Sequence, residues 1–266
     1  MKQLRLAGSI IKMMFKDRIH YPGRLVADVM STIARCGVTL ILYSYIFKNR
    51  NNDINGITFQ VAAWSMFLYF AFMNLRLRYL ATTIMDNVKS GTVENLFAKP
   101  VNYLMYRIWW QIGQGLYSFL IVLIFGSVAL WFFVGIPDTM SSAFFIVTLA
   151  IVFLLSILLS IGIYAAVGLL AFWIEDIKPL FWIIDKSVMI LGGSYLPVAL
   201  FPTLIYSIAV WSPFGASQFI THTVYESWKT NYLEMLGIQA AWIIIFFILV
   251  AIMFKKAHKR VSVNGG

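Results

Sequence analysis

The sequence predicts an all-α polytopic membrane protein that forms a single transmembrane domain over residues 1–266. Hydrophobic side chains make up 61% of the 266 residues and charged ones only 12%, which does not fit a soluble domain. Long apolar runs recur along the chain and are separated by short polar segments. We therefore expect six transmembrane helices, an amphipathic surface helix at the N-terminus, a short cytoplasmic helix and a re-entrant hairpin on the outer side.

Residues 1–23 are expected to form a helix that lies in the membrane surface. Apolar residues fall on one face of this segment and Arg5, Lys12 and Lys16 on another, as in interfacial helices. The two lysines also interrupt what would be the apolar core of a signal peptide, so we interpret the segment as structure. Pro22 and Gly23 then turn the chain into the bilayer.

The spans follow from run length, because about 20 apolar residues cross a hydrocarbon core of about 30 Å. Residues 180–193 would cover only about 21 Å, so this run is too short to cross comfortably alone. The second helix is expected to continue beyond the membrane through Arg76, Arg78 and Asp86. The predicted spans are residues 25–47, 57–75, 108–134, 142–174, 180–193 and 235–254.

Residues 194–214 are apolar but contain Pro197, Pro202 and Pro213, so a straight helix through them is not expected. We interpret this segment as a re-entrant hairpin at the outer leaflet, where surrounding protein would cover its broken backbone. The alternative is a kinked seventh span.

The distribution of basic residues sets the orientation. With both termini in the cytoplasm, 17 Lys and Arg residues lie inside and 3 outside, which follows the positive-inside rule. A seventh span would move the basic C-terminal tail outside and contradict this asymmetry. The net charge of +10 is therefore attributed to topology, and we expect no nucleic-acid partner, because the basic residues are dispersed at the ends of apolar runs.

Residues 90–99 predict a short cytoplasmic helix. Val93, Leu96 and Phe97 share one face, while Glu94 lies in the first turn, where a negative charge suits the helix N-terminus. Ser90-Gly91-Thr92 caps its start and Pro100 stops it after Lys99. An ordinary loop helix with a solvated face remains the alternative.

Two charged residues, Asp28 and Arg35, fall inside the first predicted span. An ionised side chain in the bilayer requires a partner or water, since its insertion costs at least about 2.5–3.5 kcal/mol. Arg24, four residues before Asp28, can partner the carboxylate. Arg35 could face an interface with another subunit or a path through the membrane and meet an anionic headgroup, or it could pair with a carboxylate from another helix.

The chain resembles permease subunits of type-2 ABC transporters, and the resemblance covers nearly its whole length. It is closest to a six-span bacterial branch with two motifs, GT-x-E-x-L-x-x-x-P between spans two and three and GG-x-x-x-P-x-x-x-F-P after the fifth. In this sequence the motifs comprise Gly91, Thr92, Glu94, Leu96 and Pro100, and then Gly192, Gly193, Pro197, Phe201 and Pro202.

The resemblance implies a permease without its own ATPase, coupled to two cytoplasmic ATP-binding cassette subunits that would bind ATP and Mg. The sequence has no G-x-x-x-x-G-K-[ST] phosphate loop, in agreement with this. The helix at residues 90–99 corresponds to a coupling helix, and we expect Val93, Leu96 and Phe97 to fill a groove on the partner while Glu94 and Lys99 fix the register. A second permease, identical or related, would complete the transporter.

The resemblance further implies an exporter of amphiphilic, lipid-like or drug-like molecules in a bacterial cytoplasmic membrane. Two other classes stay open. An ion-coupled secondary transporter would need acidic residues deep in broken helices, for which Asp28 and Asp185 are the candidates. A lipid-modifying membrane enzyme would need clustered His, Asp or Glu, and the sequence predicts neither a catalytic site nor a metal site.

Overall fold

The computed structural model describes residues 2–20, 22–48, 53–54, 56–97, 101–174 and 176–264. Apart from two short antiparallel strands, β1 (Asp53–Ile54) and β2 (Ile57–Thr58), the regular structure in these ranges is helical. The α-helices are α1 (Lys2–His20), α2 (Pro22–Lys48), α3 (Phe59–Met73), α4 (Tyr79–Lys89), α5 (Thr92–Phe97), α6 (Tyr103–Val134), α7 (Ala143–Leu169), α8 (Lys178–Leu191), α9 (Thr203–Trp211), α10 (Pro213–Ala216) and α11 (Trp228–Asn264), and the 3-10 helices are η1 (Asp138–Ser141), η2 (Leu170–Phe172), η3 (Val198–Leu200) and η4 (Phe219–Val224).

Four of the described helices are long and apolar enough to cross a membrane. The chain therefore has the character of a multi-pass membrane protein. α3 is apolar but has only 15 residues, and α8 has 14, so length alone does not assign either as a span. The count of six spans stays a prediction. The four long segments are Val26–Lys48, Tyr103–Val134, Ala143–Phe172 and Trp228–Arg260.

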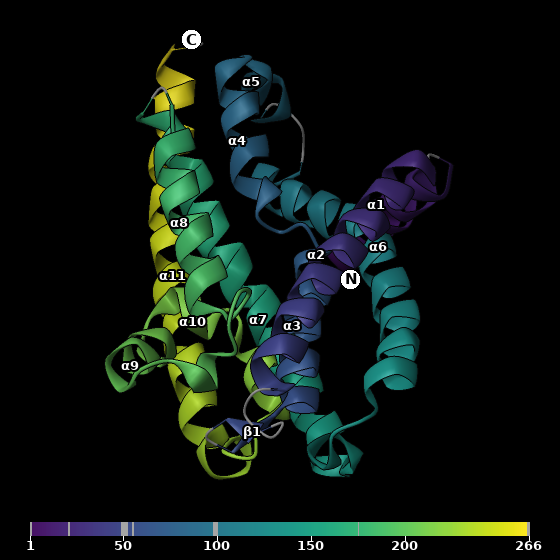
Figure 1. The fold of residues 1–266 in the computed structure, drawn as a ribbon. Coiled ribbons are helices and arrows are strands. Elements are labelled where there is room, and N and C mark those ends of the chain that lie inside the picture. The colour runs from purple at the N-terminus through teal and green to yellow at the C-terminus, as the bar shows by residue number, and fades with distance from the viewer. Residues whose placement is uncertain are drawn as a thin grey trace.

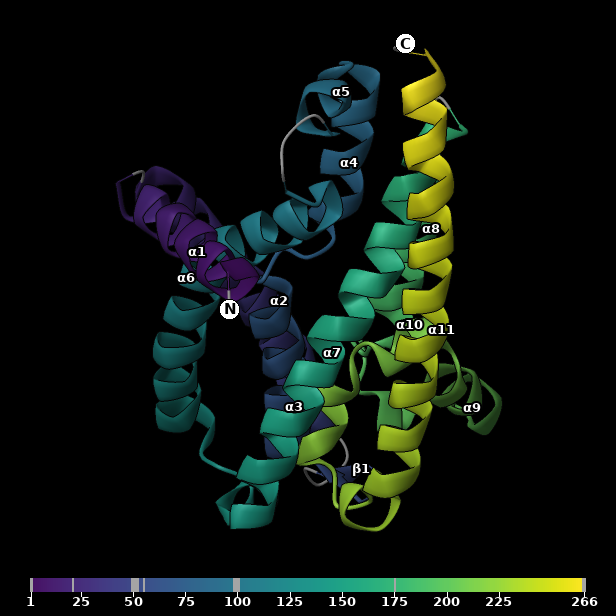
Figure 2. The same cartoon turned by 180° about the vertical axis from the view of Figure 1, so that it is seen from behind.

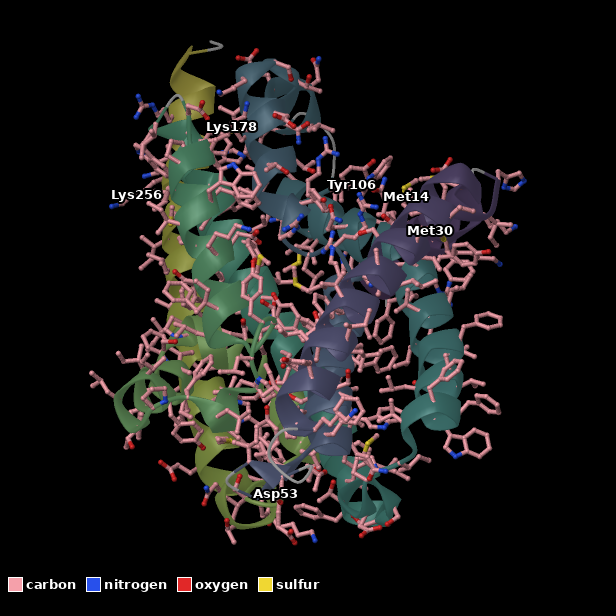
Figure 3. All side chains as sticks on the ribbon, in the orientation of Figure 1. Met14, Met30, Asp53, Tyr106, Lys178 and Lys256 are labelled. Carbon is pink, nitrogen blue, oxygen red and sulfur yellow. The ribbon has the colours of Figure 1, made fainter. Side chains whose placement is uncertain are left out.

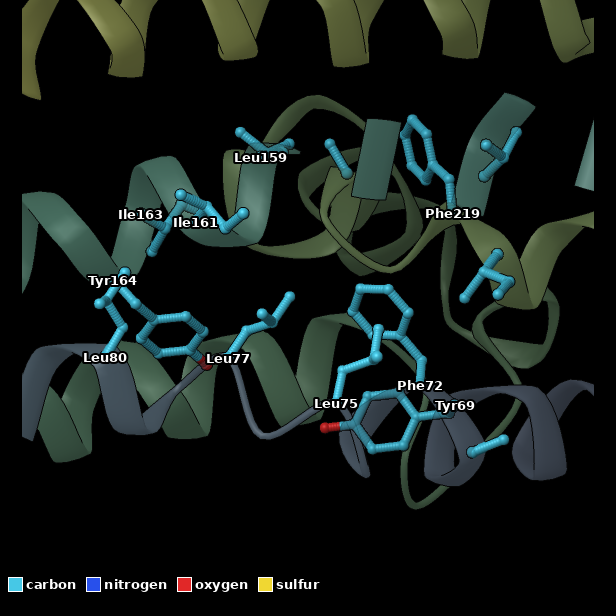
Figure 4. Close-up of a cluster of buried hydrophobic side chains, with 14 of the residues drawn as sticks. Tyr69, Phe72, Leu75, Leu77, Leu80, Leu159, Ile161, Ile163, Tyr164 and Phe219 are labelled. Carbon is cyan, nitrogen blue, oxygen red and sulfur yellow. The ribbon is translucent and has the colours of Figure 1, made fainter. Parts of the chain in front are cut away.

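α3 forms the centre of the core. All its residues from Val61 to Phe72 are buried, and a helix that is apolar all round belongs inside a bundle. Figure 4 shows its Tyr69 and Phe72 among side chains from α7 and η4, including Leu159. α4 packs along the second half of α7, so one core joins α3, α4, α7 and η4.

The chain does not continue as one helix beyond α3, in contrast to the prediction. α3 ends at Met73 and α4 begins at Tyr79, and between them Arg76 has a φ of +60°. This left-handed conformation is unfavourable for residues with a side chain and interrupts a right-handed helix. We call residues 74–78 the elbow.

α6 begins five residues before the predicted third span, because Asn102 caps its start by accepting a hydrogen bond from the backbone N–H of Met105 (3.1 Å). Figures 1 and 2 show its first turns running across the molecule before the helix turns along the bundle. α1 packs on α6, where a Cβ at Gly113 would lie 2.8 Å from the Cβ of Met14. Glycine thus permits the close approach of the two helices.

The two ends of the molecule differ. α5 and the C-terminus of α11 lie at one end and β1 at the other (Figures 1 and 2). Lys178 and Lys256 lie toward the α5 end, whereas Asp53 lies at the β1 end (Figure 3). The 37 residues of α11 extend about 55 Å, well beyond a hydrocarbon core of about 30 Å. Its basic C-terminal turns would therefore project past the membrane.

The segment at residues 194–214 is broken, as its prolines predict. Pro197 precedes η3, Pro202 caps α9 and Pro213 opens α10. α9 has nine residues, or about 14 Å, so no straight helix of membrane length passes through this segment. Its placement in the outer leaflet stays a prediction.

Candidate coupling site

Gly91 makes the turn that separates α4 from α5. Its φ of +70° is accessible to glycine without strain, and its carbonyl accepts a hydrogen bond from the backbone N–H of Glu94 (3.2 Å). The hydroxyls of Ser90 and Thr92 lie 2.7 Å apart on the same turn. The Gly-Thr pair of the first motif thus forms the start of α5.

The apolar face of α5 packs on the chain itself. Val93 and Leu96 are only 4% and 9% exposed, and the ring of Phe97 stacks on Phe254 of α11 (5.9 Å between centroids) and packs on Phe172 of η2 (6.2 Å). The expectation that these three side chains fill a groove on a partner is therefore corrected. Periodicity identified the apolar face, but it does not say which surface covers that face.

The polar face of α5 remains open. Gly91, Thr92, Glu94 and Asn95 are exposed at the end of the molecule where α11 ends. Gly91, Thr92 and Glu94 are the motif residues on this open face. Lys99 and Pro100 lie outside the described residues.

Polar contacts tie α4 to its neighbours. Asn87 donates a hydrogen bond to the hydroxyl of Tyr103 (2.9 Å) and accepts one from Arg107 (2.9 Å), which joins α4 to the start of α6. Lys89 forms an ion pair with Asp176, which precedes α8 (3.4 Å). The backbone N–H of Lys178, together with the charge of Lys89, lowers the pKa of Asp176.

The elbow carries an ion pair to α2. Arg76 donates to both carboxylate oxygens of Asp28 (2.9 and 2.8 Å), and Ser118 of α6 donates to the same carboxylate (3.1 Å). Gln111 of α6 donates to the carbonyl of Arg76 (3.0 Å) and fixes the backbone there. The expected partner of Asp28 was Arg24, whose side chain is outside those described; the observed partner comes from the elbow.

A second ion pair joins the elbow to α8. Arg78 donates to Asp185 (2.9 Å), whose other oxygen accepts from the hydroxyl of Tyr164 on α7 (3.1 Å). Asp185 is completely buried. Its pairing with an arginine of the elbow was not predicted from the sequence. The ring of Tyr79 lies within 4.8 Å of the Arg76 guanidinium and 5.0 Å of the Arg78 guanidinium.

Sequence reasoning missed these roles of Arg76 and Arg78, which it counted only as positive charges inside. One signal was available. The two arginines alternate with Leu75 and Leu77, which are buried, and a period of two is incompatible with a helical face.

Arg35 has no carboxylate partner among the described residues. It is exposed, and its guanidinium donates to the hydroxyl of Ser31 on the preceding turn (2.9 Å). Together with Asp28 and Arg76 it lines a polar cavity of about 60 Å³. Of the two interpretations of Arg35, the pairing with a carboxylate from another helix is not observed within the described residues.

The second motif lies at the far end of α8. A Cβ at Gly192 would approach the side chain of Gln218 to 2.5 Å, and Gly193 has a φ of +85°, so both positions require glycine. Pro197, Phe201 and Pro202 follow around η3 and the start of α9. The second motif does not lie beside α5. Helix α8 begins toward the α5 end of the molecule, at Lys178, and ends just before the second motif.

The possible metal ligands are spread over the described part of the chain. Among the described residues, no group of three or more His, Cys, Asp or Glu side chains could hold a metal ion. The carboxylates nearest the elbow, Asp28 and Asp185, already form ion pairs with arginine.

Comparison with known proteins identifies the family. The model of the ABC-2 family transporter proteins matches residues 33–265, which is most of the chain and includes both motifs. Comparison with curated proteins gives no match. The matched range contains α3 to α11 and most of α2. The chain therefore belongs to the ABC-2 transporter family and is a type-2 ABC transporter permease.

Proposed function

We propose that this permease is the membrane subunit of an ATP-driven exporter that moves an amphiphilic, lipid-like or drug-like molecule outward. A separate ATP-binding subunit docks on the exposed face of α5 and holds ATP and Mg. The complete transporter contains two such subunits and a second permease, identical or related. It operates in a bacterial cytoplasmic membrane with both termini inside.

The packing of α5 against η2 and α11 is the observation that carries this proposal. Its outward face presents Thr92, Glu94 and Asn95, while its inward face is fixed to the ends of η2 and α11 through Phe97. A partner that pushed on the outward face would therefore displace these helix ends directly. An ordinary solvated loop helix would not need to pack on two other helices in this way.

The elbow supplies a second route for this displacement. α4 packs closely on α7, where a Cβ at Gly168 would lie 3.0 Å from the Cα of Ala81. The elbow, which directly precedes α4, is joined to α2 by the ion pair of Arg76 and to α8 by the ion pair of Arg78. A shift of α4 and α5 would thus reach helices on both sides of the bundle.

The ion pairs weaken the alternative of an ion-coupled transporter. Such a protein needs a carboxylate that is free to bind an ion or a proton. Asp28 and Asp185, the two candidates, each accept hydrogen bonds from an arginine at 2.9 Å or less.

Charge reversal on the open face of α5 tests the docking role. The double variant Glu94→Arg with Asn95→Arg changes only exposed side chains, so the permease should fold. We expect at least a tenfold loss of the ATP-binding subunit that copurifies from native membranes, and an equal loss of ATPase activity. Charge-charge repulsion and lost contacts at a small docking surface have this effect on association.

The matched control is Glu226→Arg, which reverses an exposed charge in the turn before α11, where the chain is remote from α5. It should copurify the subunit normally. Replacing Val93 or Leu96 is not diagnostic, because both are buried and their loss would unseat α5. Normal copurification and ATPase activity of the double variant would contradict docking at α5.

A further inference from the structure

An apolar cavity opens on the side of the bundle between α2, α3 and α6. Its volume is about 550 Å³, within the range of about 300–1,000 Å³ typical of small-molecule sites. Cys36 and Leu40 of α2, Phe67 of α3, and Phe125 and Leu130 of α6 contribute to its lining. A cavity of this size and composition suits a hydrocarbon chain.

A polar cavity adjoins the apolar one, and Thr32 lines both. The charges around the polar cavity are unbalanced. Arg76 is paired with Asp28, which also lines it, and Arg78 is paired with Asp185, whereas Arg35 contacts only the neutral hydroxyl of Ser31 among the described residues. The site therefore holds one positive charge that a negative ligand would neutralise.

The two cavities are ordered along the bundle. On α3 the polar cavity takes Phe70 and Met73 beside the elbow, whereas the apolar cavity takes Phe67, about one turn further from it. On α2 the apolar cavity extends past Arg35 as far as Leu40. A ligand that occupied both cavities would therefore place its headgroup near the elbow and its hydrocarbon chain between the middle parts of α2 and α6. This is the orientation of a lipid in the leaflet on the α5 side.

We propose that these cavities form a binding site for one anionic membrane lipid, with its headgroup at Arg35 and an acyl chain between α2, α3 and α6. The charge of Arg35 requires a counter-charge at this depth, since an unpaired guanidinium beside hydrocarbon is costly. Headgroup binding supplies that charge. The site requires neither transport nor an ATP-binding subunit, so its test is separate from that of the proposed function.

Native mass spectrometry of the purified full chain in detergent measures this binding. The probes are phosphatidylglycerol and phosphatidylcholine with the same acyl chains. We expect the first phosphatidylglycerol to bind about fivefold more tightly, which corresponds to the ~1 kcal/mol that a basic residue contributes at an anionic membrane surface. Arg35→Gln should remove this preference, and Arg35→Lys should keep most of it.

A second test of lipid binding fills the apolar cavity with a larger side chain. A Cβ at Gly37, which lines the cavity, meets no atom within 4 Å, so Gly37→Leu can occupy the space without a backbone clash. It should weaken the binding of both lipids. The matched control is Gly237→Leu on α11, where a Cβ likewise has open space, and Lys256→Gln controls for loss of an exposed charge.

Equal binding of both lipids to the wild-type chain, or unchanged preference in Arg35→Gln, would overturn the proposal. So would unchanged lipid binding in Gly37→Leu. A change of the permease from dimer to monomer in Gly37→Leu, with lipid preference intact, would show that a second copy of the chain covers the cavity, and this also overturns the proposal.

Discussion

The two ion pairs of the elbow are built alike but lie in different environments. Arg76 and Arg78 are two residues apart, and each holds a carboxylate from another helix at 2.8–2.9 Å. In the Asp28 pair the side chains are 23% and 25% exposed, and the pair lines an open cavity. In the Asp185 pair the carboxylate is fully buried and also accepts from Tyr164.

The difference in burial between Asp28 and Asp185 indicates that the two ion pairs have different roles. Separating a buried ion pair leaves an uncompensated charge and is costly, so the Asp185 pair fixes the elbow to α7 and α8. The Asp28 pair is reached by water and polar headgroups, which can replace either partner at lower cost. We infer that the elbow is anchored on the α8 side and adjustable on the α2 side.

The largest effect is expected at the buried pair. Asp185→Ala removes the carboxylate that pairs with Arg78, the one acidic partner of this arginine among the described residues, and leaves a half-buried guanidinium beside the hydroxyl of Tyr164. Breaking such a pair from one side destabilises a protein by about 3–5 kcal/mol. The thermal unfolding midpoint in detergent and a denaturant titration measure the loss.

The matched variant for this prediction replaces both charges, Arg78→Met with Asp185→Leu. It should recover much of the lost stability, because no uncompensated charge remains. If Asp185→Ala destabilised the protein no more than a surface substitution, the anchoring role of this pair would be refuted.

A smaller effect is expected at the open pair. Asp28→Asn keeps the size of the side chain and its contact with Ser118 but removes the charge opposite Arg76. We expect a loss of about 1–2 kcal/mol, between the values typical of exposed and buried pairs. The same unfolding measurements apply, with Asp86→Asn on the exposed side of α4 as the control. A loss equal to that of Asp185→Ala would mean that the two pairs do not differ.

Much of the fold was predictable, because run length and composition decide which segments suit a membrane. The long helices α2, α6, α7 and α11 coincide with predicted spans, and the prolines correctly indicated the breaks after α8. The family was also correctly identified from two motifs. The break at Arg76 was not predicted, although the alternation of arginine with Leu75 and Leu77 was a signal against a continuous helix there.

The site was predictable only in part. The pattern around Val93 and Leu96 correctly indicated an amphipathic helix, but not that its apolar face would pack on η2 and α11. Likewise, run length identified Asp28 as a charge within a span, whereas its partner Arg76 lies 48 residues further along. Such contacts depend on tertiary packing, which local sequence patterns do not encode.

The smallest effect isolates the backbone of the elbow from its charges. Arg76→Ala and Arg76→Gly both remove the Asp28 pair, so their difference reports the cost of the φ of +60°. Glycine avoids a left-handed penalty of about 1–2 kcal/mol but loses about 0.5–1 kcal/mol through its greater unfolded-state entropy, so Arg76→Gly should be the more stable variant by about 0.5–1 kcal/mol.

Position 78 is the control, because Arg78 has a right-handed φ of −57°. There the order should reverse, with Arg78→Ala more stable than Arg78→Gly by about 0.5–1 kcal/mol. Unfolding of the four variants under one set of conditions measures both differences. The same order at both positions would show that the conformation of Arg76 does not strain the elbow, and that the ion pairs alone account for the difference between its two sides.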